Sequence, residues 1–158
     1  MIFKHDTFAN LYQNPGYQAM ALRAYAEIPL FPGARPSQRF GAEYLGQEKL
    51  KILEVFTAHS GDQLAGFCLH HIYIHPHYFQ QKHSNQIVLY LDPVHRKGNN
   101  GINFINWCDR HLADIGVNFV HRAVPELKKW GKVLEWTGYK PLETFYVKQL
   151  NGVEHDRY

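Results

Sequence analysis

The segment from residue 96 to 102 reads RKGNNGI and combines residue types that can bind an anion through the backbone. It follows an apolar run at 87–91 and precedes a helix-like pattern. Its glycines can adopt angles closed to other residues, and its asparagines tolerate the left-handed region. Amides at such a turn point at one spot, beside two basic side chains. A pyrophosphate site is predicted, and an ordinary chain turn is the alternative. The residues concerned are Arg96, Lys97, Gly98, Asn99, Asn100, Gly101 and Ile102.

Three titratable side chains earlier in the chain are candidate general bases. His70 and His71 lie in an apolar run that predicts a strand. Because neighbouring strand residues point to opposite faces, one of them is expected to face the cleft side of the sheet. Glu54, on the preceding strand, is the third candidate. The favoured alternative for the histidine pair is that one is buried with a hydrogen-bond partner while the other faces solvent.

Histidines are dense enough after residue 70 to raise the question of a metal ion. His71 and His75 have the same strand parity, which would place them on one face. However, the sequence has no His-Glu-x-x-His motif and no cysteine pair, and Pro76 interrupts the strand. We therefore expect no metal site. The histidines concerned are His70, His71, His75, His77 and His83.

Length and composition describe one globular domain. The chain has 158 residues, of which 45% are hydrophobic, and this excludes both a disordered chain and a multidomain enzyme. The net charge of +3 is too small and dispersed for a nucleic-acid surface. Cys68 and Cys108 lie apart in apolar segments, so we expect free structural thiols in a reducing compartment. No apolar run has the length of a membrane span or a secretory signal.

Hydrophobic periodicity predicts the elements that position these residues. The segment from 87 to 124 predicts a strand, a glycine turn, a helix and a strand, which is a βαβ crossover. The domain is expected to span 1–150, with 151–158 as a loosely held tail. In chain order, the expected elements are helices at 19–28 and 37–45, strands at 51–59 and 64–75 around a tight turn, a loop at 75–84, a strand at 87–91, a helix at 102–115, a strand at 117–124, a helix from Pro125 to Gly138 and a strand at 142–150.

This order of elements resembles the GNAT family of acetyl-CoA-dependent N-acyltransferases over residues 18–150. Family members carry Arg or Gln, two residues, Gly, one residue, then Gly or Ala after their fourth strand. Arg96 matches the first of these positions and Gly101 the last. Asn99 stands where the first Gly is expected, and Gly98 comes one residue early. Asn99 can adopt the left-handed geometry that the missing glycine would have.

Three further positions carry the resemblance, and two depart from it. Gly138 and Tyr139 are similar to the family's closing Gly-Phe pair, and Gly66 is similar to a glycine of its third strand. Many members have a Tyr that acts as the general acid where Leu134 stands, and some have a Glu that acts as the general base where Gln86 stands. Both usual proton-transfer groups are therefore absent, and the apolar spacing around Leu134 predicts core packing.

The resemblance implies both a fold and a reaction. The fold class is α/β (α+β), a single GNAT-like domain with a mixed, mostly antiparallel central sheet flanked by helices. The reaction is transfer of an acetyl group from acetyl-CoA to a small amine or a protein amino group. The coenzyme would lie against Leu89, Tyr90 and Leu91 and the loop at 96–102, and the amide of Tyr90 would donate to the thioester oxygen.

The missing acid and base keep a second interpretation open, namely a catalytically inactive GNAT-like binding or structural protein. A phage virion or host-interaction component is an example, and small proteins of this kind are common in tailed phages. The first interpretation implies acetyl-CoA and an amine acceptor as partners, in the cytoplasm of a bacterial or infected host cell. The second implies a homo-oligomer or a virion partner. Neither a membrane nor a nucleic acid is an expected partner.

Overall fold

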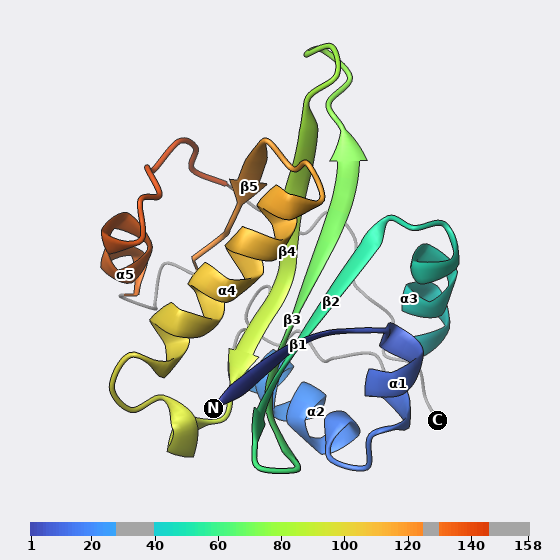
Figure 1. Ribbon diagram of the computed structural model, residues 1–158, viewed down its shortest axis with the longest axis vertical. Helices are drawn as coiled ribbons and strands as arrows, with labels where there is room; N and C mark the ends of the chain where they lie inside the picture. The colour runs from blue at the N-terminus through green and yellow to red at the C-terminus, as the bar shows by residue number, and fades with distance from the viewer. Residues whose placement is uncertain (28–39, 125–129, 146–158) are drawn as a thin grey trace, which may run out of the picture.

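The sheet at the centre of the fold has five strands in the order β1-β2-β3-β4-β5. The computed structural model describes residues 1–27, 40–124 and 130–145 (Figure 1). Strands β1 to β4 are antiparallel neighbours, and β5 runs parallel to β4. In chain order the elements are β1 (Ile2–Asp6), α1 (Phe8–Gln13), α2 (Tyr17–Glu27), α3 (Phe40–Lys49), β2 (Leu53–Ser60), β3 (Gln63–Ile74), β4 (Lys82–Leu91), the 3₁₀ turn η1 (Pro93–His95), α4 (Asn100–Asp114), β5 (Phe119–His121) and α5 (Gly131–Trp136).

The two hairpins follow from turn chemistry and strand alternation. β2 and β3 are joined by two residues, of which Gly61 has φ +60° and so supplies the conformation that a tight turn requires. The predicted hairpin is confirmed. β3 and β4 continue beyond the other strands as a long hairpin, which projects from the top of the molecule in Figure 1.

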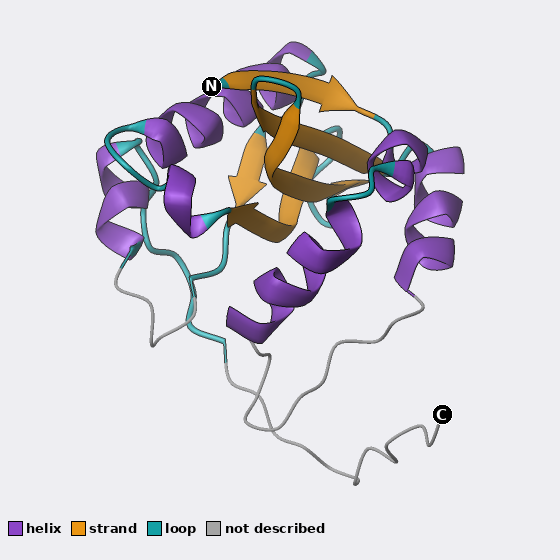
Figure 2. Ribbon diagram, turned by 90° about the horizontal axis from the view of Figure 1, so that it is seen from below, coloured by secondary structure: helices purple, strands orange, loops and turns teal. Residues whose placement is uncertain are grey.

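Each face of the sheet has its own hydrophobic core, and Figure 2 shows helices on both sides. One face packs against α1 and α2, and the other packs against α4. The first core includes Phe8, Leu11, Tyr17, Met20, Val55, Phe67, Leu69 and Tyr90. The second includes Phe56, Ala58, Cys68, Leu91, Phe104, Cys108 and Leu112.

The predicted crossover is present, with α4 between the parallel strands β4 and β5. Apolar spacing placed Ile105, Cys108 and Leu112 on one helix face, and all three are buried. Gly116 follows the helix with φ +83°, and the N–H of Val117 donates to Leu112 O at 2.9 Å. This is the αL ending that a glycine after a helix favours.

The N-terminal segment differs from the sequence-based prediction, which had no element before residue 19. β1 pairs with β2 over five residues, although IFKHD lacks a clear alternation of apolar and polar residues. Thr7 then caps α1 by accepting from the Asn10 N–H at 3.1 Å. β4 also begins at Lys82, inside the predicted loop, because its polar first half pairs with strands on both sides. Pairing partners, rather than local hydrophobicity, define these strands.

The C-terminal third also differs in extent. The strand predicted at 117–124 is limited to Phe119–His121, and residues 142–145 of the last predicted strand form no strand. Gly138 ends the α5 region with φ +95°, as predicted. The remaining parts of these predictions, at 28–39, 125–129 and 146–150, and the predicted tail at 151–158 lie outside the described residues. None of the helices in the described part of the chain could cross a membrane.

Candidate active site

Strands β4 and β5 part after three residue pairs. His83, Ser84 and Asn85 pair with β5, whereas β4 continues beside β3 to Leu91. The register of β3 with β4 shifts at Ile87, which is the extra residue of a bulge and is 37% exposed. A bulge bends a strand and ends pairing on one side. Among the described residues, the stretch 87–91 therefore has no strand partner on its β5 side.

The backbone alternation decides which amides face that unpaired edge. The N–H of Asp92 donates to Ala65 O at 2.8 Å, so by alternation the N–H of Tyr90 is directed at β3 as well. The backbone groups of Leu89 and Leu91 face the other way. Leu91 O confirms this direction, since it accepts from Arg96 Nε at 2.6 Å. The expected oxygen donor, the Tyr90 amide, is thus off by one residue, and Leu89 and Leu91 offer their amides instead.

The loop after β4 leads into α4, and the first backbone amides of that helix are free to bind a ligand. Gly98 has φ +59°, whereas Asn99 has φ −94°, so the left-handed residue is Gly98 and not Asn99 as expected. Asn99 caps α4 without a side-chain hydrogen bond. The first amides of a helix have no carbonyl one turn earlier to bond. A Cβ built at Gly98 or Gly101 would meet nothing within 4 Å, so the loop surface is open.

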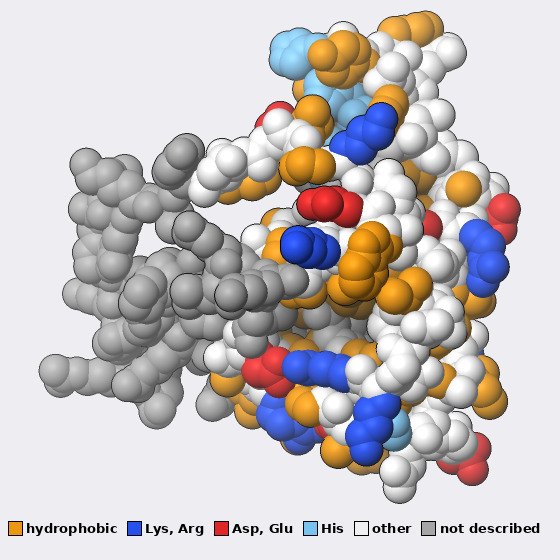
Figure 3. Space-filling model, turned by 90° about the vertical axis from the view of Figure 1, so that its left-hand side faces the viewer, with side chains coloured by type: hydrophobic (Ala, Val, Ile, Leu, Met, Phe, Trp, Pro, Cys, Tyr) orange, Lys and Arg blue, Asp and Glu red, His pale blue; other side chains and the backbone are white. Residues whose placement is uncertain are grey.

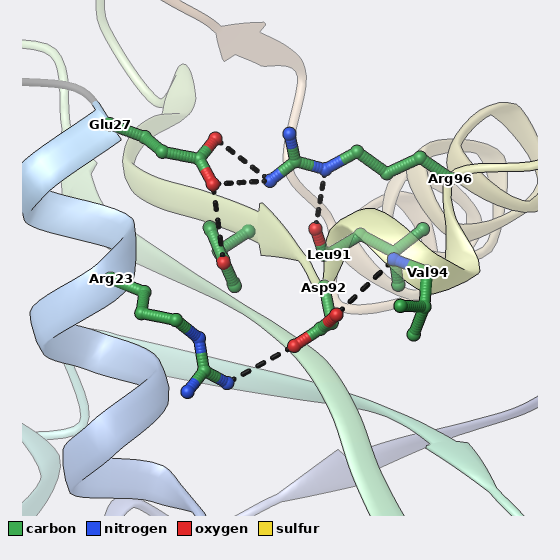
Figure 4. A network of polar contacts seen from close by, with 7 residues as sticks. Arg23, Glu27, Leu91, Asp92, Val94 and Arg96 are labelled. Atoms are coloured by element: carbon green, nitrogen blue, oxygen red, sulfur yellow. Dashed lines mark hydrogen bonds and ion pairs between the residues drawn. The ribbon is translucent and has the colours of Figure 1, made fainter.

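Arg96 holds the loop in place through contacts with α2 and with the end of β4 (Figure 4). Its Nη2 donates to both carboxylate oxygens of Glu27, at 2.9 and 3.1 Å, and its guanidinium lies 5.2 Å from the ring centre of Tyr90. Burial raises the pKa of Tyr90, whose hydroxyl donates to Glu27 at 3.3 Å. Beside this pair, Arg23 donates to Asp92 at 3.1 Å. In this structure Arg96 is thus held in an ion pair, whereas Lys97 is exposed.

The three candidate bases lie apart from the unpaired edge. His70 is fully buried on the α4 face, with Nδ1 2.7 Å from Ser84 Oγ, which matches the favoured structural interpretation of the histidine pair. His71 is half-buried on the opposite face, beside Tyr73. Glu54 pairs in register with His70, which pairs with Gln86, so it lies two strands, or about 10 Å, from β4. None of the three side chains is brought to Leu89 or Leu91.

A buried polar network, missed by sequence reasoning, lies where β4 and β5 part. The side chain of Arg122 is fully inaccessible and donates to Asp109 Oδ1 at 2.6 Å, to Tyr139 Oη at 2.8 Å and to Gln86 Oε1. Tyr139 in turn donates to Asp109 Oδ2 at 2.9 Å. Burial opposes the charge, but the neighbouring Cys68, Asp109 and Tyr139 groups raise the pKa of Arg122, so it stays a cation. The network ties β4, α4 and the segment after α5 together.

The residues at the two positions that depart from the family pattern both have structural roles. Leu134 is 5% exposed, so its predicted role in core packing is confirmed. Gln86 accepts from Arg122 and so helps to neutralise a buried charge. Neither residue can transfer a proton at neutral pH. A signal for the network was available, since the sequence places an Arg after a strand, an Asp on a helix and a Tyr after a helix-ending glycine.

Some of the histidines that are dense after residue 70 form a cluster at the projecting end of the β3–β4 hairpin. His83 Nδ1 lies 2.9 Å from His121 Nε2, and the rings of His75 and His83 are 4.7 Å apart. Figure 3 shows histidine side chains gathered with hydrophobic ones at this end. Phe119 and Tyr78, at 50% and 56% exposure, belong to the same surface. These side chains are separate from the loop that precedes α4.

Comparisons with known proteins identify the fold. Neither a protein-family model nor a protein in the curated set matches the sequence. Solved structures do match: an aminoglycoside acetyltransferase from an uncultured soil metagenomic sample, in complex with sisomicin, has a TM-score of 0.69 and 12% identity over 97% of this chain and 96% of that one. A protein described as a predicted acetyltransferase, from Clostridium acetobutylicum and with acetyl-CoA, has a TM-score of 0.70 and 11% identity over 98% of each chain. The fold is thus that of the GNAT acetyltransferases.

One further structure shows why the fold leaves the activity open. A protein described as a transcriptional regulator from Bacillus halodurans has a TM-score of 0.68 and 13% identity, over 94% of this chain and 99% of that one. At such identities, similarity of architecture carries no residue roles with it. The function has to be argued from the residues of this chain.

Proposed function

We propose that this chain is an N-acyltransferase that uses acetyl-CoA to acetylate a small amine or a protein amino group. The observation that carries the proposal is the unpaired edge of β4 at 87–91, which leads directly into the open loop before α4. An extended ligand can hydrogen-bond to such an edge as an added strand would. The solved structure with acetyl-CoA supports the same cofactor class in this fold.

The residues present fit the two ends of that cofactor. Amides of Leu89 and Leu91 would pair with the amide groups of the pantetheine arm and with the thioester oxygen. The free amides of Asn100, Gly101 and Ile102 would receive the pyrophosphate, assisted by the exposed charge of Lys97. Gly98 and Gly101 leave the space into which the phosphates would come. Arg96 would contribute indirectly, because its hydrogen bonds to Leu91 O and Glu27 hold the loop in position.

The chemistry asks little of the side chains. The amine nitrogen attacks the thioester carbonyl carbon, a C–N bond forms, the C–S bond breaks, and the thiolate leaves with its electron pair. The nitrogen then loses one proton, to water or to the departing thiolate. A backbone amide at Leu89 or Leu91 would stabilise the oxygen charge that develops. With Leu134 and Gln86 at the usual acid and base positions, the acceptor has to arrive unprotonated. Losing such a group typically slows a reaction about 10²- to 10⁴-fold, so weak turnover that rises with pH is expected.

Calorimetry with acetyl-CoA and coenzyme A tests the cofactor directly. Gly101→Val places a branched side chain at the open loop and should abolish binding. Gly46→Val is the matched control, because Gly46 lies on α3 with equally open space around it, and it should bind as the wild type does. If the wild type shows no heat at millimolar ligand, the cofactor assignment is wrong.

A non-catalytic binding or structural role is the second candidate, because Leu134, Gln86 and Arg96 are all engaged in packing or ion pairing. A partner protein, including a virion component or a second copy of the chain, would then replace the amine. The two candidates separate in one assay. If acetyl-CoA binds but a broad amine panel releases coenzyme A no faster than buffer does, the binding role is correct.

A further inference from the structure

Three side chains on the α4 face of the sheet converge far from the unpaired edge of β4. His5 comes from β1, Glu54 from β2 and His111 from the last turn of α4. His5 Nε2 is 2.7 Å from Glu54 Oε2, and His111 Nε2 is 3.8 Å from the same oxygen. One nitrogen or oxygen of each residue lies within 4.8 Å of the other two. Three elements distant in sequence therefore present two imidazoles and one carboxylate at a single point.

We propose that His5, Glu54 and His111 form a zinc site that joins β1, β2 and α4. Two histidines and one glutamate are a ligand set that Zn²⁺ accepts, with a water as the fourth ligand. In a tetrahedral site with bonds of about 2.0 to 2.1 Å, ligand atoms lie roughly 3.3 Å apart. The separations of 2.7 and 3.8 Å lie on either side of that value, so small side-chain rotations bring the ligands to it.

Nε2 of His111 gives a second indication that the cluster can bind a ligand. This atom is buried and has no hydrogen-bond partner among the described residues. Buried polar atoms are normally satisfied, so one that is not calls for an ion or a water beside it. The atom faces Glu54 at a distance too long for a hydrogen bond and suited to a shared ion.

The surroundings orient the ligands and leave one side open. The ring of Phe56 lies 5.8 Å from His5 and 5.4 Å from His111, and Trp107 stacks against His111 at 6.1 Å. These aromatic rings form an apolar floor that restrains both imidazoles. The side chain of His5 is 46% accessible, so solvent reaches the cluster from that side and can supply the fourth ligand.

The simpler interpretation is a hydrogen-bonded pair of His5 and Glu54 with His111 beside it. That arrangement accounts for the 2.7 Å contact but leaves Nε2 of His111 without a partner. Mg²⁺ and Ca²⁺ are disfavoured as occupants because they prefer oxygen ligands. The inference is independent of acetyl transfer, since the site lies two strands away from β4.

Zinc titration of the untagged full chain tests the site, with a chromophoric chelator as competitor. We expect one tightly bound Zn²⁺, whose affinity falls at least 100-fold in His5→Ala and in Glu54→Gln. At a free zinc concentration 100 times the wild-type Kd, the thermal midpoint should rise by about 5 to 10 °C in the wild type and by no more than about 1 to 2 °C in either variant. Co²⁺ in place of zinc should give the visible absorption of a tetrahedral ion.

The histidine cluster of the β3–β4 hairpin supplies the control. The double variant His75→Ala/His77→Ala removes two exposed or half-buried imidazoles and leaves the proposed site intact. It should bind zinc as the wild type does. The inference is overturned if the wild type binds no zinc, or if binding survives both His5→Ala and Glu54→Gln. Loss of binding in the hairpin variant instead would place the ion at the hairpin.

Discussion

Glu27 and Arg96 form the ion pair that connects the N-terminal helices to the loop before α4. Glu27 is the last residue of α2, and its carboxylate accepts from Arg96 Nη2 at 2.9 and 3.1 Å (Figure 4). The same guanidinium holds Leu91 O at the end of β4. The pair therefore sets where the loop lies relative to the sheet, and it neutralises the charge of Arg96 at the start of that loop.

Replacing that charge should favour anion binding. Glu27→Gln keeps the shape of the side chain and removes the carboxylate that neutralises Arg96, so that the positive charge beside the loop can attract phosphate. We expect coenzyme A affinity to rise about fourfold at low salt, as a charge a few ångströms away in a solvated setting would predict, and less at high salt. Because both side chains are partly exposed, the free energy of unfolding should fall by no more than about 1 kcal/mol.

Calorimetry at two ionic strengths measures the change. Glu43→Gln, on α3, is the control for net charge, and it should leave the affinity unaltered. Weaker binding in Glu27→Gln would show that the position of the loop matters more than the local charge.

The buried Arg122 should make its partners individually important for stability. Asp109→Asn leaves a fully inaccessible cation without its carboxylate and should cost about 3 kcal/mol. Tyr139→Phe removes one hydroxyl that both donates and accepts, and should cost about 1 to 2 kcal/mol. Urea unfolding measures both values. Equal and small losses would indicate that water satisfies Arg122 in the variants.

Two histidines should make the fold sensitive to mild acid. Burial, followed by Lys4, lowers the pKa of His59, and burial with His121 and His75 lowers the pKa of His83. With a folded pKa below the unfolded value of about 6.5, each contributes stability that is present above pH 6.5 and lost as the pH falls. The free energy of unfolding should therefore decrease between pH 7.5 and pH 5.5.

Variants at these positions test the cause of that pH dependence. His59→Gln and His83→Gln should each flatten the dependence, whereas His77→Gln, at an exposed position, should not. Stability that rises on acidification would contradict the assignment.

The sequence predicted the crossover and the β2–β3 hairpin because their signals are local. The apolar face of α4 and the glycines at 61 and 116 define those elements without help from distant residues. β1 could not be predicted, since IFKHD becomes a strand only by pairing with β2. Similarly, the resemblance alone implied the Tyr90 amide, whereas the hydrogen bond from the Asp92 N–H to Ala65 O shows which backbone groups face the edge.

The candidate bases show the same limit. The residue types of Glu54, His70 and His71 are visible in the sequence, but their usefulness depends on which face and which strand they occupy. The register places Glu54 with His5 and His111, so a side chain chosen for proton transfer proves to belong to another cluster.

Both thiols should react slowly in the native protein. Cys68 and Cys108 have no exposed surface, and burial raises the pKa of Cys108. Because neither sulfur is exposed, reagents cannot reach either thiol in the folded protein. Labelling with an aromatic disulfide should be limited by unfolding, and both thiols should react at once in urea. Rapid labelling of Cys68 without denaturant would indicate that the sheet opens on the α4 face.

Restoring a carboxylate at residue 86 should fail to restore base catalysis. Gln86 accepts a hydrogen bond from Arg122, so a Glu there would lie against a buried cation that is already paired with Asp109. A neighbouring cation favours the charged carboxylate and lowers its pKa. Such a group is a poor base near neutral pH, because general bases work best with a pKa close to the working pH.

In Gln86→Glu, the rate of acetyl transfer to a generic amine should therefore stay within about threefold of the wild-type rate. The rate should also rise with pH as it does in the wild type, because that rise follows the acceptor's own titration. Initial rates of coenzyme A release from pH 6.5 to 9 measure this, with His71→Ala as the comparison on the other face of the sheet. A rate increase of about 10²-fold or more in Gln86→Glu, with a plateau above pH 7, would instead show that residue 86 reaches the acceptor and that Arg122 leaves its carboxylate free to take a proton.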